Sequence, residues 1–184
     1  MELSIVATLY NSSDYIGEFC SRISSCAASL VDDFEIILVD DGSPDDSLVV
    51  AKEAQRNNPK IKIIELSKNF GHHRAMMIGL NHSIGNKTFL IDVDLEEQPE
   101  DLERYWKKME EDPEIDVVYG YQESRETPLL RTLASNIFHS LFDKLTSSKT
   151  PRGELVSRLM SRPYLDNLCR YTERELYLPG IWAD

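Results

Sequence analysis

The sequence predicts an α/β fold: a Rossmann-like, mostly parallel sheet flanked by helices, in a single domain. Three observations predict it. Short β-branched runs alternate with longer segments of helical periodicity, which is typical of βαβ units. Several of the short runs are continuously apolar, as expected for parallel strands buried on both faces. The length of 184 residues, with 41% hydrophobic and 28% charged residues, suits one domain with a substantial core.

Strands and helices are expected to alternate through the first 120 residues. Asp, Ser or Pro residues stand near the expected helix starts, where they favour the first turn. The expected strands are residues 3–8, 34–39, 61–66, 88–93 and 115–119, and the expected helices are residues 14–30, 45–56, 73–82 and 99–111.

The regular alternation of strand and helix patterns ends at Pro128. Apolar residues at helical spacing predict a helix over residues 129–145, followed by a strand over 155–160 and a helix over 163–169. The chain ends in an apolar, aromatic run over residues 176–184 without a capping signal. This ending suggests that the protein continues beyond the sequence in hand.

Composition excludes several classes of protein. The 20 basic and 32 acidic residues give a net charge of −12, whereas nucleic-acid binders cluster Lys and Arg against phosphates. Cys20, Cys26 and Cys169 form no CxxC pair, which argues against a disulfide framework or a zinc ribbon and favours a reducing, cytoplasmic setting. No segment approaches the roughly 18 apolar residues of a membrane span.

Ligands of open α/β sheets bind beyond the carboxyl ends of the strands, so the loops after the strands are where function is expected. Four such loops carry polar side chains suited to binding. They are residues 10–12, 40–43, 67–74 and 92–96, and the first contributes Tyr10 and Asn11.

Asp92 and Asp94 form the most informative pair. If both lie on the end of a strand, residues i and i+2 point to the same side, about 7 Å apart. Their carboxylates then converge on one hard cation, Mg²⁺ or Mn²⁺, which completes its shell with water and phosphate oxygens. The alternative is a surface turn with two solvated acids. The apolar run before Asp92 favours the cation site.

Asp40 and Asp41 follow an apolar run and precede Gly42. A carboxylate at such a strand end accepts a hydrogen bond from a base N–H or a ribose hydroxyl. The alternative is that Ser43 or Asp45 merely caps the next helix. Both interpretations hold together if Asp41 faces the ligand and Asp45 caps.

Lys68 and Arg74 lie in a segment, residues 67–91, that has three basic residues and no acidic one. Their loop leads into a helix start, where backbone N–H groups and the helix dipole favour an anion. A diphosphate is therefore expected there, and a pair of solvated cations is the alternative. The adjacent His72 and His73 have no metal-binding spacing, and one is expected to donate a hydrogen bond in the loop.

Taken together, Tyr10-Asn11, Val39 to Ser43, Asn69-Phe70-Gly71 and Asp92 to Leu95 resemble, in order and spacing, family 2 glycosyltransferases of the GT-A fold. The resemblance is nearest to polyprenyl-phosphate sugar transferases, relatives of dolichol-phosphate mannose synthase. It extends to residues 158–162 and 180–182. It implies an inverting, metal-dependent transfer from a nucleotide diphosphate sugar to a polyprenyl-phosphate or glycan acceptor, in cell-envelope or polysaccharide synthesis. UDP is the expected carrier because it is the commonest in the family.

The resemblance also implies roles for single residues. Asp94 matches the main metal ligand, and Asp92 matches the acid that reaches both ribose and metal. Asp41 matches the acid that reads the base. The donor set further includes Tyr10, Asn11, Asp40, Lys68 and Arg74. Glu96 stands where the family often has glutamine, so it is a candidate third metal ligand.

The general base is left open, because the acid expected just before residues 157–159 is missing. A phosphate acceptor needs little deprotonation at neutral pH, whereas a sugar hydroxyl needs a base within hydrogen-bond reach. Glu173 and Glu175 are the candidates for a hydroxyl acceptor.

As a whole, residues 1–184 are interpreted as one catalytic domain, with a nucleotide-sugar binding half over residues 1–120 and an acceptor-side half over 121–184. Related lipid-linked enzymes continue into membrane helices, so the full-length protein is expected at the cytoplasmic face of a membrane. Two alternatives remain: a nucleotide-sugar binding module without turnover, and a haloacid-dehalogenase-like phosphatase. The phosphatase motif fits less well because Glu96 occupies its fifth position and the motif lies mid-chain.

Overall fold

The computed structural model describes residues 1–122, 153–171 and 178–182. The expected helix over 129–145 and the candidate bases Glu173 and Glu175 lie outside these residues. The strands are β1 (Leu3–Leu9), β2 (Phe34–Asp40), β3 (Ile61–Glu65), β4 (Lys87–Leu90), β5 (Val117–Tyr121) and β6 (Glu154–Ser161). The helices are α1 (Ile16–Leu30), α2 (Ser47–Asn57), α3 (His72–His82), α4 (Asp101–Glu111), α6 (Arg162–Leu168) and α7 (Leu178–Trp182).

The six strands form one mixed sheet in the order β3-β2-β1-β4-β6-β5. The pairs β1–β2, β1–β4 and β2–β3 are parallel, whereas β6 runs antiparallel to both β4 and β5. The last strand in sequence thus lies between two earlier ones. This confirms a mostly parallel Rossmann-like sheet and adds an antiparallel extension on one side.

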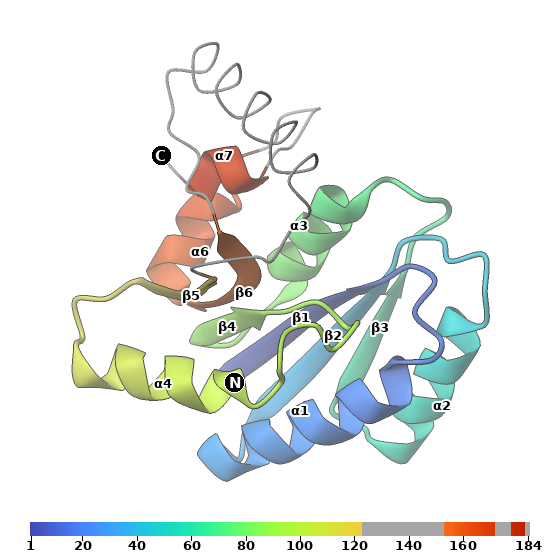
Figure 1. The fold of residues 1–184 in the computed structure, drawn as a ribbon, viewed down its shortest axis with the longest axis horizontal. Helices are drawn as coiled ribbons and strands as arrows, with labels where there is room; N and C mark the ends of the chain where they lie inside the picture. Colours follow the sequence, from blue (N-terminus) through green and yellow to red (C-terminus); the bar gives the residue numbers. More distant parts are fainter. Residues whose placement is uncertain (123–152, 172–177, 183–184) are drawn as a thin grey trace, which may run out of the picture.

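Helices cover both faces of the sheet (Figure 1). The first core contains β1 residues such as Ile5 together with Phe19 of α1, Ala51 of α2 and Leu102 of α4. The second core joins Val6 to residues of α3, α6 and α7. The alternation of β1 side chains between the two faces explains why every residue of the strand is buried, since both faces are covered.

The prediction for the fourth strand was wrong at its end. The strand stops at Leu90 rather than at residue 93, although Ile91 and Val93 are buried. The Ile91 N–H still donates to the carbonyl of Val6, at 3.1 Å, and the chain then leaves the sheet. The apolar run continues because these side chains enter the first core, not because the backbone stays in the ladder. Asp92 and Asp94 therefore lie on a turn, not on a strand.

Candidate active site

The loops that follow β1 to β4 meet at the carboxyl edge of the parallel strands, as the sequence predicted. The Asp41 N–H donates to the Leu9 carbonyl at 3.0 Å, and the Ser43 hydroxyl donates to the same carbonyl at 3.3 Å. Gly42 has a φ of +66°, and a Cβ there would lie 2.6 Å from the carbonyl carbon of Lys68. The loops after β1, β2 and β3 are therefore packed against one another, and only glycine fits at their junction.

Asp41 binds the protein's own backbone. Its two carboxylate oxygens accept hydrogen bonds from the N–H groups of Phe70, at 2.7 Å, and Gly71, at 3.0 Å. The residue is only 3% exposed. Asp41 thus places a carboxylate just before α3, and the diphosphate expected at the start of this helix stays a prediction. These bonds hold the loop that carries Lys68, whose Nζ lies 5.2 Å from the centroid of the Phe70 ring.

Asp40 and Asp45 lie to either side of Asp41 in the chain and differ in their surroundings. Asp40 is the last residue of β2 and 2% exposed, and its Oδ1 has no hydrogen-bond partner among the described residues. Its carboxylate lies beneath the loops rather than on their surface. Asp45 accepts hydrogen bonds from the N–H and hydroxyl of Ser47, at 3.2 and 2.6 Å, and from the N–H of Ser13, at 3.1 Å. It therefore contacts the first residue of α2, but the N-cap position itself is Asp46, so the prediction that Asp45 caps this helix was wrong by one residue.

Four carboxylates gather in residues 92–97, which we call the acidic turn. Asp94 is exposed, and its Oδ1 accepts a hydrogen bond from the Glu96 N–H at 3.0 Å. Leu95 has a φ of +62°, a left-handed conformation that is uncommon for a branched residue. Burial, followed by repulsion from Asp94, Glu97 and Glu96, raises the pKa of Asp92 to about 7. Such crowding of like charges is typical of a site that receives a cation.

His72 connects the acidic turn to β1. Its Nε2 lies 3.4 Å from Asp92 Oδ1, and its Nδ1 lies 3.1 Å from the Thr8 hydroxyl. Partial burial and the neighbouring His73 lower the pKa of His72, so the imidazole is neutral near pH 7. One of the two histidines was expected to donate a hydrogen bond in the loop, but no sequence motif joins His72 to Asp92 and predicts their contact.

The acidic side chains of the turn suit a divalent cation only in part. Within residues 1–122, 153–171 and 178–182, no three His, Cys, Asp or Glu side chains converge closely enough to hold a metal ion by themselves. Asp92 and Asp94 supply hard oxygen donors, and Mg²⁺ characteristically takes one or two carboxylates and completes its shell with substrate phosphates and water. The donor set therefore fits a cation shared with a diphosphate.

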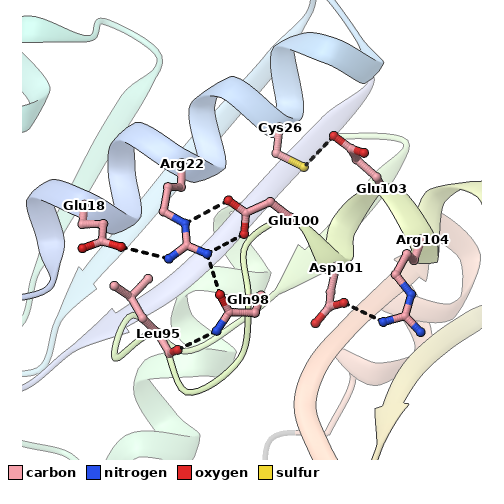
Figure 2. A network of polar contacts seen from close by, with 9 residues as sticks. All are labelled: Glu18, Arg22, Cys26, Leu95, Gln98, Glu100, Asp101, Glu103 and Arg104. Atoms are coloured by element: carbon pink, nitrogen blue, oxygen red, sulfur yellow. Dashed lines mark hydrogen bonds and ion pairs between the residues drawn. The ribbon is translucent and has the colours of Figure 1, made fainter.

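Arg22 of α1 supports the far side of the acidic turn (Figure 2). Its guanidinium donates to both carboxylate oxygens of Glu100, at 2.9 and 2.6 Å, and to Gln98 Oε1 at 2.6 Å. Gln98 in turn donates to the carbonyl of Leu95 at 3.1 Å. Arg22 of α1, acting through Gln98, thus stabilises the left-handed conformation of Leu95.

Tyr10 and Asn11 follow β1, and Tyr10 is 48% exposed, while Asn11 has a φ of +54°. Arg158, on β6, was noted only as part of the resemblance. It is 1% exposed, and its Cζ lies 3.0 Å from the centroid of the Trp182 ring. Burial lowers its pKa to about 10, while Glu154, 3.9 Å away, favours the charged form. It packs β6 against α7.

A family model described as glycosyl transferase family 2 matches residues 4–169. The chain belongs to glycosyl transferase family 2. This family assignment makes it a glycosyltransferase and sets aside the phosphatase alternative.

Named relatives agree with the family. A protein of Mycobacterium tuberculosis (strain CDC 1551 / Oshkosh), named as a glycosyltransferase, is 41% identical over 182 residues, which are 99% of this chain and 53% of the relative. An undecaprenyl-phosphate 4-deoxy-4-formamido-L-arabinose transferase of Salmonella choleraesuis (strain SC-B67) is 32% identical over 97% of this chain and 54% of the relative. This family 2 chain thus spans about half the length of these relatives.

Solved structures show the GT-A fold. A mannosyltransferase of Pyrobaculum calidifontis, in complex with GDP-Man and Mn²⁺, has a TM-score of 0.63 at 19% identity, covering 91% of this chain and 46% of its own. A glucosyl-3-phosphoglycerate synthase of Mycobacterium tuberculosis, in complex with UDP, has a TM-score of 0.64 at 19% identity, covering 88% and 57%. At this identity the likeness concerns the fold alone. Among the described helices none is long and apolar enough to cross a membrane.

Proposed function

We propose that this family 2 glycosyltransferase moves a sugar, with inversion, from a UDP-sugar to a polyprenyl-phosphate or glycan acceptor, with Mg²⁺ or Mn²⁺. The observation that carries the proposal is the acidic turn. It gathers Asp92 and Asp94, with the pKa of Asp92 raised to about 7, at the edge of the sheet where the loops after β1, β2 and β3 also meet.

Each binding residue has a part in holding the donor. Asp92 and Asp94 would hold the cation, with Glu96 as a further carboxylate at the rim. When bound, the cation neutralises charge on the leaving diphosphate. Tyr10 offers an exposed ring for stacking a base, beside Asn11. Lys68 and Arg74 lie on the loop and helix start that face the same edge, where they offset phosphate charge.

The roles of Asp40 and Asp41 follow from their contacts. Asp41 holds the loop after β3 through the Phe70 and Gly71 N–H groups, and a base N–H would share the same carboxylate. Asp40 lies buried beneath the loops, so it supports the donor site from below.

In the transfer, an acceptor oxygen forms a bond to the anomeric carbon as the bond from that carbon to the diphosphate oxygen breaks. The leaving nucleotide takes the electron pair. A phosphate acceptor is already ionised near neutral pH and needs no strong base. The relative named for undecaprenyl phosphate supports an acceptor of this kind. If the acceptor is a hydroxyl, Glu173 and Glu175 are the bases we propose.

The chain divides accordingly into a donor half, residues 1–120, and an acceptor half, residues 121–184. We place the full-length protein at the cytoplasmic face of a membrane, because a polyprenyl phosphate is itself a membrane lipid.

Calorimetry with UDP, GDP and their sugars, with and without Mn²⁺, tests this function. We expect binding that Mn²⁺ strengthens and that Asp94→Ala abolishes. Asp112→Ala is a matched control, because Asp112 Oδ1 accepts a hydrogen bond from the Glu114 N–H at 3.0 Å in a turn beyond α4, like that of Asp94 with Glu96. The proposal fails if no nucleotide binds with metal dependence, or if Asp94→Ala binds like the wild type. Binding without any turnover of the sugar donor would instead indicate a binding module.

A further inference from the structure

We propose that Glu97 is a positioning residue, which ties the acidic turn to β6 and thereby fixes where Asp92 and Asp94 lie. The effect on metal binding rests on the proposed function, whereas the contact itself does not.

The pairing of β6 with β5 is irregular. Tyr119 of β5 pairs with Arg158, and Tyr121 pairs with Glu154. Two steps along β5 thus match four steps along β6, so residues 155–157 face Gly120 alone. On its other side, β6 has no partner strand over residues 155–157, because β4 ends at Leu90, opposite Arg158. Backbone N–H groups in this bulge lack ordinary ladder partners, and buried N–H groups need acceptors.

Glu97 supplies the acceptors. Its Oε1 accepts from the Val156 N–H at 2.9 Å, and its Oε2 accepts from the Ser157 N–H at 2.7 Å. Consecutive N–H groups that converge on one anion form a strong, directional site, and bonds to an ionised acceptor are about twice as strong as neutral ones. The carboxylate thus occupies the place that a continuation of β4 would take.

The bulge is a rigid anchor for Glu97. The Ser157 hydroxyl and the Tyr105 hydroxyl of α4 are 2.9 Å apart and buried. Gly120 leaves room for the same tyrosine and for Leu155, since a Cβ there would lie 2.8 Å from Leu155 Cδ1 and clash with the Tyr105 hydroxyl. The bulged backbone is therefore fixed by the core on the face covered by α4.

Both ends of the acidic turn are consequently attached to the sheet. The Ile91 N–H bonds to β1 before the turn, and Glu97 bonds to β6 after it. Between these points, the charge of Asp94 repels the ionised form of Asp92. We call the two hydrogen bonds of Glu97 to the Val156 and Ser157 N–H groups the clamp. The clamp holds the acidic turn against this repulsion before a cation binds, so that cation binding does not have to order the turn.

Glu97→Gln tests the clamp. The amide keeps the size of the side chain but replaces one acceptor oxygen with an NH₂ group that faces an N–H donor. We expect the amides of Val156 and Ser157 to exchange hydrogen about tenfold faster by nuclear magnetic resonance, because a charge-assisted bond is lost. In the presence of UDP, we expect the Kd for Mn²⁺ to rise about tenfold, while the affinity for UDP without metal stays within twofold.

Glu111→Gln is the control, since it removes the same charge from an exposed pair with Lys108, 3.1 Å apart, at the end of α4. Glu97→Asp keeps the charge but is too short to reach both N–H groups, so an intermediate loss of Mn²⁺ affinity is expected. Unchanged amide exchange or unchanged Mn²⁺ affinity in Glu97→Gln would overturn the inference. An equal loss of metal-free UDP binding would also overturn it, because Glu97 would then support the fold in general. If the wild type itself binds no UDP with Mn²⁺, the proposed function fails, and the amide exchange still decides on the clamp.

Discussion

Asp92 combines two conditions that oppose ionisation, since its side chain is 25% exposed and three other carboxylates lie near it. An ionised carboxylate in such surroundings lowers the free energy of unfolding of the metal-free protein. A bound cation would remove this destabilisation. The histidine beside Asp92 is neutral near pH 7 and does not remove the destabilisation. The position of Asp92 is thus unfavourable for the stability of the metal-free protein, as the proposed cation site would require.

Replacing Asp92 with asparagine is expected to stabilise the metal-free protein. Because the folded pKa of about 7 lies above the unfolded value near 3.8, ionisation lowers the free energy of unfolding, fully above pH 7 and not at all below pH 4. We expect Asp92→Asn to gain about 2 kcal/mol at pH 8, discounted for the exposed quarter of the side chain, and nothing at pH 3.5. Urea unfolding in EDTA measures this, with Asp112→Asn as control. A gain that is equal at both pH values would contradict the reason given.

The sequence predicts the positions of several single residues but not all of their contacts. The loops that carry Tyr10, Asp41, Lys68 and Asp94 were predictable, because ligand-binding loops follow parallel strands. The hydrogen bonds of Asp41 to Phe70 and Gly71 were not, because a carboxylate after a strand has the same sequence signature whether it faces a ligand or a neighbouring loop. Glu97 was passed over for the same reason, as one of four acids in a short run.

At the scale of elements, β1 and β2 were predicted to within a residue at each end, because strands covered on both faces are rich in apolar and β-branched residues. The same rule failed for β4, where Ile91 and Val93 are buried without belonging to the strand. It also misplaced β5, which runs from Val117 to Tyr121 rather than over 115–119. An edge strand pairs on one side only, so its sequence carries a weaker signal.

The bulge in β6 depends on Gly120, and this yields an element-scale prediction. Gly120→Ala places a methyl group against Leu155 and the Tyr105 hydroxyl, and we expect a loss of about 2 kcal/mol in the free energy of unfolding. Gly17→Ala is the contrast, because nothing lies within 4 Å of a Cβ there and the residue is helical, so a gain of about 0.5 kcal/mol is expected. Urea denaturation of both variants measures the difference, and two losses of equal size would contradict this account of the bulge.

At the scale of the molecule, the two ends of the sheet differ in how their carboxylates are compensated. The carboxyl end carries the crowded acidic turn. The amino end carries Glu35, which is 1% exposed and accepts hydrogen bonds from the Ser4 hydroxyl at 2.6 Å and the Ile84 N–H at 3.1 Å. Its other oxygen lies 2.6 Å from Lys62 Nζ. The buried carboxylate at the amino end therefore has partners that stabilise its charge, whereas the carboxylates of the acidic turn repel one another.

Acid is expected to weaken the stabilisation that Glu35 provides at the amino end of the sheet. Burial alone would raise the pKa of Glu35, but the bonds from Lys62, Ser4 and the Ile84 N–H outweigh it and lower the pKa. The stabilisation is therefore present above the unfolded pKa near 4.5 and is lost as the pH falls through the folded value. We expect Glu35→Gln to lose about 2 kcal/mol at pH 7 and progressively less below pH 4, as measured by urea unfolding. A loss that does not shrink in acid would show that packing, not charge, is responsible.

The position of β6 between β4 and β5 has a consequence for the order of assembly. A growing chain makes β4 and β5 long before residues 154–161 leave the ribosome, so β4 is paired only with β1, and β5 has no partner strand in the sheet, until β6 is made. Contacts between distant parts of a chain form slowly, since a long loop must close first. In refolding experiments, fluorescence from Trp106 on α4 should therefore report early burial, while nucleotide binding returns with a later phase. Chaperones would meet an intermediate with a finished parallel half and an open edge at β4.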